Sequence, residues 1–244
     1  MTATPSPRAL LDKLVSFPTV SRDSNLDLID WVETYLQGIG ASVVRVPSPC
    51  GNKAALYAHV GPMVPGAVVL SGHTDVVPVD GQDWTTDPFT VVEKDGKLFG
   101  RGCCDMKGFD ALALWAMGHA ASQGVSRPLQ IALSYDEEIG CTGAPVMIDH
   151  MVAHNMPRGD TVLVGEPSMM QVVTGHKGGI GLSVHVRGFE VHSSKITEGV
   201  SAVMQAARLI DWANQINAQQ VAKAPAPMAA AFDPPFTSLH VGTI

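Results

Sequence analysis

The sequence predicts an α/β fold in which a mixed sheet carries helices on both faces, followed by a smaller α+β segment. In the first part of the chain, short apolar runs that are typical of buried strands alternate with segments of helical periodicity. This alternation is typical of a sheet covered on both faces. After about His176 the pattern changes to polar and apolar residues in alternation around one long helix. We therefore expect a first domain over 1–177 and a second over 178–244.

The individual elements follow from spacing and from turn residues. Apolar residues at helical spacing predict helices over 7–16, 25–38, 106–123 and 144–154. Alternation or a continuous apolar run predicts strands over 41–46, 52–60, 67–72, 129–135 and 161–165. Asp95-Gly96 is a hairpin turn signal between short strands at 89–93 and 97–99. In the second domain we expect a strand at 181–187, a helix at 200–216, a linker at 222–227 and a strand at 236–244.

Composition limits the classes of partner and the compartment. The 244 residues carry a net charge of −7 without a basic run, which argues against a nucleic-acid surface. The N-terminus lacks an apolar signal core and no apolar stretch approaches membrane-spanning length, so no membrane partner is expected. The four cysteines show neither a C-x-x-C zinc spacing nor a disulfide framework. A reducing cytoplasm is the simplest location for such a chain.

Three predicted buried strands are each followed by a polar side chain with metal-binding chemistry. Val68–Leu70 precedes His73, 131–133 precedes the acidic run that contains Glu137, and 162–164 precedes Glu166. The carboxyl ends of strands in an α/β sheet form the edge at which ligands bind. Histidine with carboxylates and without paired cysteines is the ligand chemistry of a hydrolytic zinc, cobalt or manganese site. The sequence thus predicts a metal site at this edge.

His73 and Asp75 stand two residues apart on one extended stretch, so their side chains point the same way. A carboxylate that accepts the second ring N–H of a metal-bound imidazole fixes its tautomer and raises its basicity. His73 is then the ligand and Asp75 its orienting partner. The alternative is a loop histidine beside a turn-forming aspartate.

Asp105 lies in a glycine-rich stretch just before a predicted helix. Its carboxylate could bridge two cations, since two-metal hydrolases hold their ions about 3.5–4 Å apart and one carboxylate spans that distance. The alternative is a helix N-cap, which aspartate favours strongly. The two roles are compatible with each other.

Glu137 and Glu138 are consecutive at a strand end, so their side chains need not do the same job. One can bind metal while the other activates the substrate water and later protonates the leaving amine. Glu166, before Pro167, is a third candidate ligand. The alternatives are an exposed acidic turn for the pair and an ordinary loop residue for Glu166.

His192 lies in the second domain, far along the chain from the other candidates. It could polarise a substrate carbonyl and stabilise a tetrahedral oxyanion. The alternative is a hydrogen-bonded surface histidine at the entry to a helix.

With these residues assembled, the chain resembles the M20 family of metallohydrolases. The matching stretches read SGHTDVVPVDGQDW, GRGCCDMKGFDALAL, SYDEEIGCTGA, VGEPSMMQVVTGHKG and VRGFEVHSS, and they span nearly the whole chain. The resemblance implies a binuclear metallohydrolase domain followed by a lid, or dimerisation, domain. It implies that His73, Asp105 and Glu166 bind one metal, and that Asp105 bridges to a second metal bound by Glu138.

The same resemblance implies the remaining roles. Glu137 is the general base and acid, Asp75 orients His73, and His192 reaches the active site of the opposite subunit of a homodimer that forms through the lid. Two divalent ions, Zn or Co, are the expected cofactors. The implied reaction is hydrolysis of an N-acyl amino acid, with N-acetyl-L-ornithine yielding L-ornithine and acetate in arginine biosynthesis. A desuccinylase acting on succinyl-diaminopimelate, an aminoacylase and a peptidase are the alternatives within the family.

One departure from the family pattern concerns length, because the sequence ends inside the lid after PFTSLHVGTI. We therefore expect an incomplete lid and the absence of the returning part of the catalytic domain. The resemblance places the last histidine ligand of the second metal in that part. A truncated, non-catalytic metal-binding product is accordingly a further alternative.

Overall fold

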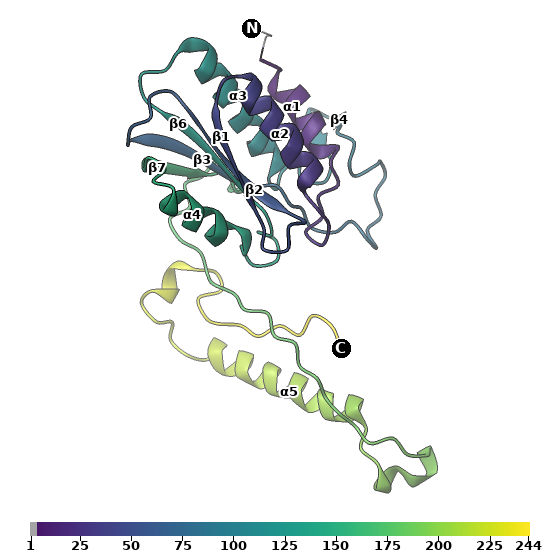
Figure 1. Ribbon diagram of the computed structural model, residues 1–244. Helices are drawn as coiled ribbons and strands as arrows, with labels where there is room; N and C mark the ends of the chain where they lie inside the picture. The colour runs from purple at the N-terminus through teal and green to yellow at the C-terminus, as the bar shows by residue number, and fades with distance from the viewer. Residues whose placement is uncertain (1–3) are drawn as a thin grey trace. The chain divides into compact units, whose positions relative to one another are not determined.

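The computed structural model describes residues 4–244, which form two compact units. The division falls between Met170 and Gln171, whereas the sequence places the domain boundary after residue 177. The first unit contains the sheet, and the second contains one long helix (Figure 1).

A mixed five-stranded sheet forms the centre of the first unit. Its strands, in spatial order, are β1 (Ser42–Pro47), β2 (Ala54–Val60), β6 (Leu129–Ser134), β3 (Ala67–His73) and β7 (Gly159–Val164). β1, β2 and β6 pair antiparallel, while β3 pairs parallel with both β6 and β7. The predicted mixed α/β sheet is thereby confirmed.

Helices cover both faces of this sheet (Figure 1). The helices are α1 (Pro7–Val15), α2 (Leu26–Gly38), α3 (Lys107–Gln123) and α4 (Gly143–Ala153). Successive residues of a strand face opposite sides, and β2 shows this clearly. Leu56 and Ala58 pack in the core under α1, α2 and α3, whereas Tyr57 packs with Met147 of α4. Both cores are apolar, so the sheet is fixed from both faces.

The β4–β5 hairpin is shorter than predicted. β4 (Val92–Lys94) and β5 (Lys97–Phe99) flank Asp95 and Gly96, whose φ angles of 52° and 70° suit a tight hairpin turn. The predicted start of the first strand at residue 89 was wrong. The Phe89 N–H donates to the Asp87 carboxylate at 2.9 Å, which holds this segment in a turn.

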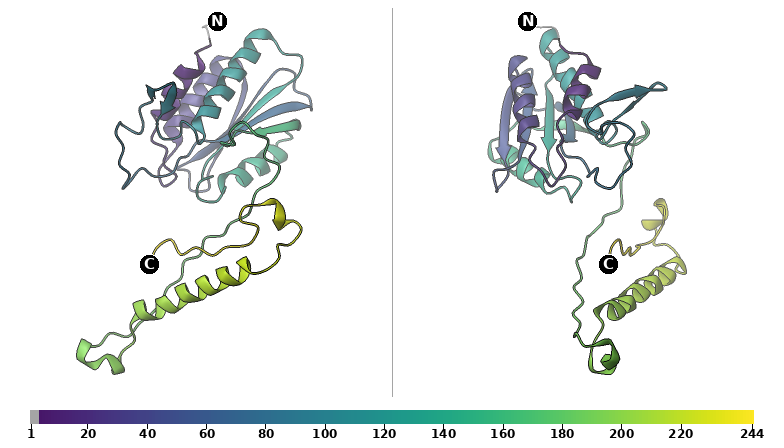
Figure 2. Two further views of the ribbon diagram at one scale, coloured as in Figure 1. Left: turned by 180° about the vertical axis from the view of Figure 1, so that it is seen from behind. Right: turned by 90° about the vertical axis from the view of Figure 1, so that its right-hand side faces the viewer.

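The main regular element of the second unit is one long helix. α5 (Ala202–Val221) confirms the predicted helix and extends it beyond residue 216, and two short 3₁₀ helices, η1 (Ser193–Glu198) and η2 (Ala229–Ala231), flank it. The strands expected at 181–187 and 236–244 were wrong, and both segments are drawn without strand arrows in Figure 2. The Asn217 side chain of α5 bonds both the N–H and the carbonyl of Leu239 at 2.8 Å. Alternation alone does not form a strand, because a strand needs a neighbour whose backbone completes the ladder.

Candidate metal centre

The parallel strands bring the predicted metal-binding residues to one edge of the sheet. In the register of the sheet, His73 of β3 lies opposite Ser134 of β6, and Ser71 lies opposite Val164 of β7. The Gly165 N–H extends this register by donating to the Ser71 carbonyl at 3.2 Å. The segments that follow β6 and β7 therefore leave the sheet beside His73, with the acidic side chains upon them.

His73 lies at the centre of this acidic group. Its imidazole is buried, and Nε2 lies 3.2 Å from Asp105 Oδ1, 3.7 Å from a Glu166 oxygen and 3.9 Å from a Glu137 oxygen. Two overlapping triads bring one ligand atom from each member within 4.8 Å of one another, and they are His73, Asp105 and Glu138, and His73, Glu137 and Glu166. All five residues that sequence analysis proposed as ligands or base thus meet in one place, and His73 is common to both triads.

The other ring nitrogen of His73 faces the chain of its own loop. Nδ1 lies 2.9 Å from the backbone carbonyl of Asp75 and 3.4 Å from that residue's carboxylate. The shorter contact is to the carbonyl, so both parts of Asp75 hold the ring. With a proton kept on Nδ1, the lone pair of Nε2 points at the carboxylates, which is the arrangement that metal ligation requires.

Asp75 does more than hold the ring, because its buried carboxylate also fixes the turn that carries the two glutamates. It accepts hydrogen bonds from the backbone N–H of Glu137 at 3.1 Å and of Glu138 at 3.3 Å. The Ser21 hydroxyl donates to the same carboxylate at 2.6 Å. Sequence analysis missed this link, because the partners are separated by more than fifty residues and leave no local pattern.

Asp105 does not cap α3 with its side chain. The helix begins at Lys107, its N-cap is Met106, and within the described chain that cap makes no side-chain hydrogen bond. The Asp105 side chain is about half exposed (47%) and lies against His73. The N-cap alternative is therefore not what the structure shows, and the carboxylate remains available to a ligand.

The charges of the centre fit a bound cation. Burial disfavours the His73 imidazolium, but Asp75 and the nearby acidic charges outweigh it and raise the pKa of His73 to about 10. Burial, together with the charge of Asp105, raises the pKa of Glu138 and of Glu166. Burial and repulsion between the neighbouring carboxylates both disfavour the ionised form of these acids when no cation is near. A divalent ion would offset that repulsion, and the imidazole with its carboxylate oxygens is a suitable donor set for Zn, Co or Mn.

A second buried pair lies behind the centre on α3. Burial raises the pKa of Asp110 to about 8 and lowers that of Lys107 to about 7. The Lys107 ammonium donates to the Phe17 carbonyl at 2.7 Å, while Asp110 lies against Gly72. A Cβ at Gly72 would come within 2.1 Å of an Asp110 oxygen, so glycine is needed there. Neither member of the pair has a signal in the sequence that marks it as buried.

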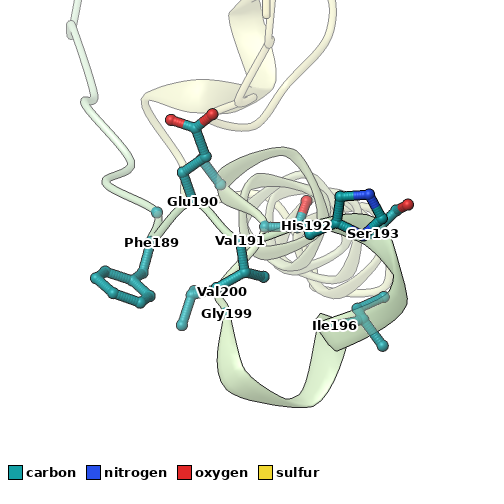
Figure 3. A pocket seen from close by; sticks show the side chains of 11 residues that line it. Phe189, Glu190, Val191, His192, Ser193, Ile196, Gly199 and Val200 are labelled. Atoms are coloured by element: carbon teal, nitrogen blue, oxygen red, sulfur yellow. The ribbon is translucent and has the colours of Figure 1, made fainter.

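His192 belongs to the second unit. It is the N-cap of η1, and its Nδ1 accepts from the Ser194 N–H at 3.3 Å. A depression of about 410 Å³ lies beside it, with Val191 and Ile196 among the lining side chains (Figure 3). In this unit His192 is an exposed, hydrogen-bonded residue at a helix entry.

The chain belongs to peptidase family M20/M25/M40, whose sequence profile matches residues 69–241. This is the class of protein that the sheet and its acidic edge define. The chain is also 36% identical, over 98% of its length, to an acetylornithine deacetylase of Myxococcus xanthus. It spans 62% of that relative's length.

Solved structures agree on the fold. An M20 family metallo-carboxypeptidase from Sulfolobus solfataricus is 19% identical, with a TM-score of 0.57 over 66% of this chain and 37% of its own. Human carnosine dipeptidase 1 is 23% identical, with a TM-score of 0.58 over 65% of this chain and 38% of its own. A tripeptidase from Staphylococcus aureus is 18% identical, with a TM-score of 0.54 over 86% of this chain and 57% of its own.

Proposed function

We propose that the protein is a metal-dependent amide hydrolase that removes the acetyl group from N-acetyl-L-ornithine, giving L-ornithine and acetate. The observation that carries this proposal is the convergence of one imidazole nitrogen and four carboxylates at the carboxyl ends of parallel strands. Such a set holds a hydrolytic metal and has one acid to spare for proton transfer. The choice of an acetylated amino acid as substrate is supported by the relative from Myxococcus xanthus, which is named for that reaction.

We assign the ligand roles from the resemblance to the M20 family, because the two triads that the structure brings together divide the same residues differently. His73, Asp105 and Glu166 would hold one divalent ion, Zn or Co, and Asp105 would also serve a second ion held by Glu138. When bound, the ions supply a polarised water and stabilise negative charge on the acyl oxygen. Asp75 keeps the His73 ring in place through its carbonyl and carboxylate.

Glu137 would transfer the proton. Its carboxylate takes a proton from the water as the new C–O bond forms at the acyl carbon. It then delivers that proton to the amine nitrogen as the C–N bond breaks, so that the glutamate returns to its starting state. Its Oε1 lies 3.4 Å from the Cys141 thiol and its Oε2 faces His73, so the acid is held at the centre by its neighbours.

We further propose that two copies of the protein pair through the second unit and that His192 then stabilises the oxyanion in the partner's site. The molar mass of the protein in solution tests the pairing. A monomer whose turnover is unaffected by His192→Ala would contradict this part of the proposal.

Within residues 4–244, no helix combines the length and the apolar character needed to cross a bilayer.

The test of the proposed function combines turnover with metal content in one variant. Glu137→Gln should abolish hydrolysis of N-acetyl-L-ornithine and leave the number of bound ions unchanged. Glu93, whose exposed side chain pairs with Arg8 at the surface, supplies the matched control, and Glu93→Gln should change neither quantity. Because Glu137 also belongs to one of the two metal-capable triads, a loss of metal in Glu137→Gln would make it a ligand instead of the base.

Specificity is tested with three amides. Rates with N-acetyl-L-ornithine, N-succinyl-diaminopimelate and an unblocked dipeptide, each measured on the zinc-loaded and the cobalt-loaded protein, separate a deacetylase from a desuccinylase and a peptidase. We expect the first substrate to have the highest kcat/KM. A preference for the dipeptide would overturn the proposed substrate while leaving the amide chemistry in place.

A further inference from the structure

A buried lysine far from the acidic residues in sequence joins the network behind the centre. Lys53, just before β2, is 8% exposed, and its ammonium donates both to the Ser21 carbonyl and to the Asp136 carboxylate. Asp136 immediately precedes the two glutamates and is itself largely buried, with 14% of its side chain exposed. Lys53 is therefore tied to the turn that carries Glu137 and Glu138.

These contacts close a ring. The Lys53 ammonium binds the Ser21 carbonyl, the Ser21 hydroxyl donates to Asp75 at 2.6 Å, and Asp75 accepts the Glu137 N–H at 3.1 Å. From Glu137 the chain leads directly back to Asp136, whose carboxylate binds Lys53. The same carboxylate of Asp75 lies against the His73 imidazole. The closed set of contacts therefore connects the glutamate turn to that imidazole.

Both ends of the Lys53 link are fixed. The Lys53 N–H donates to the Ser48 hydroxyl at 3.2 Å and its carbonyl accepts the Ser48 N–H at 2.8 Å, which anchors its backbone. Asp136 has a φ of 58°, a left-handed conformation that is uncommon outside glycine and that the surrounding contacts must stabilise. The ion pair on the Asp136 side chain is such a contact, because its partner Lys53 has a backbone anchored at Ser48.

We propose that Lys53 is a positioning residue, which holds the Glu137–Glu138 turn against Asp75 and so sets where the two glutamate carboxylates meet the metal centre. The inference rests on the proposed function for its consequences in catalysis, but the positioning itself is a property of this network. Loss of the ammonium would free the turn at Asp136, while His73 and Glu166, which lie on other segments, would keep their places. The effect should therefore fall on the Glu138 side of the centre.

The experiment uses Lys53→Met, which keeps the apolar stem and removes the charge, with Lys53→Arg as the conservative variant. Exposed Lys97 in the β4–β5 hairpin supplies the control Lys97→Met. Hydrogen exchange on the metal-free chain should show amides in 135–142 exchanging about tenfold faster in Lys53→Met, with β6 and α3 unchanged. Lys53→Arg should restore much of the protection, and Lys97→Met should match the wild type.

Zinc titration gives a second readout. Removing a group that orients ligands typically lowers metal affinity about 10–100-fold, and we expect that loss for one ion only in Lys53→Met. Asp136→Asn, which removes the charge of the ion pair, should show both effects in the same direction, and adding it to Lys53→Met should change little further, because both variants act on the same link. If Lys53→Met does not fold, Asp136→Asn still tests whether the link between Lys53 and Asp136 positions the glutamate turn.

Exchange in 135–142 that equals the wild type in folded Lys53→Met or Asp136→Asn would overturn the proposal. So would an equal loss of affinity for both ions, which would indicate a general structural role. If the wild-type chain bound no zinc and hydrolysed no amide, the proposed function would fail, and the exchange result would still decide whether Lys53 positions the turn.

Discussion

Asp75→Asn is the substitution that most directly tests how the centre is held together. The two side chains have the same shape, but the amide has one accepting oxygen where the carboxylate has two. In the structure one carboxylate oxygen accepts the Glu137 N–H at 3.1 Å, and the other accepts the Glu138 N–H at 3.3 Å and the Ser21 hydroxyl. Whichever way the introduced amide turns, its NH₂ group faces a backbone N–H that it cannot bond.

The expected loss of stability follows from the number of hydrogen bonds that the amide cannot accept. A hydrogen bond to a charged group contributes about 1.5–3 kcal/mol, and the variant loses at least one in a buried place. We expect the free energy of unfolding of the metal-free protein to fall by about 1.5–3 kcal/mol at pH 7. Although burial opposes ionisation, His73, Ser21 and the Glu137 N–H hold the pKa of Asp75 below its usual value. A lowered pKa gives stability that is present above the ordinary carboxyl value and lost in acid, so the difference from wild type should shrink below about pH 4.

The assay is urea unfolding of wild type, Asp75→Asn and a control, Asp149→Asn, at pH 7, 5 and 3. Asp149 is exposed on α4, so its variant should unfold with the wild type. Zinc affinity should also fall about 10–100-fold in Asp75→Asn, because Asp75 orients the His73 ring. An Asp75→Asn protein as stable as the control at pH 7 would refute the reasoning that this carboxylate supports the glutamate turn.

Two further predictions concern the residues behind the centre. Gly72→Ala should lower the free energy of unfolding by about 1–3 kcal/mol in urea titrations, because its Cβ would lie 2.1 Å from an Asp110 oxygen, whereas Gly38→Ala meets nothing within 4 Å and should not destabilise α2. Equal effects of the two substitutions would contradict the packing described. Burial raises the pKa of Asp110 to about 8, so the folded state holds this proton more tightly and stability is lost as pH rises towards that value. Between pH 5 and pH 7, the free energy of unfolding of the metal-free wild type should therefore fall by about 1–3 kcal/mol more than that of Asp110→Asn. An equal pH dependence of the two proteins would contradict this reasoning.

The sheet and the convergence of the candidate metal-binding residues at one edge were predictable because their signals are local. An apolar run followed by His73 or by Glu166 predicts both a strand and the residue at which that strand ends. Parallel strands then bring such ends together without further information. The burial of His73 and its contacts with Asp105 agree with that expectation.

What the sequence did not predict depends on contacts between distant segments. Lys53 and Ser21 are ordinary polar residues in the sequence, and only the fold places them against Asp136 and Asp75. The strands expected around residue 184 and residue 240 failed for a related reason. Their alternating pattern is present, but Leu239 bonds the Asn217 side chain instead of a neighbouring strand.

The central claim is that two cations share the Asp105 carboxylate, and anomalous scattering at the zinc edge from crystals of the zinc-loaded protein tests it most directly. We predict two zinc peaks, one on either side of Asp105, with His73 and Glu166 at the first and Glu138 at the second. Two-metal hydrolases set the expected separation at about 3.5–4 Å. A single peak, or a peak held by His73, Glu137 and Glu166 with Asp105 bound to none, would contradict the account.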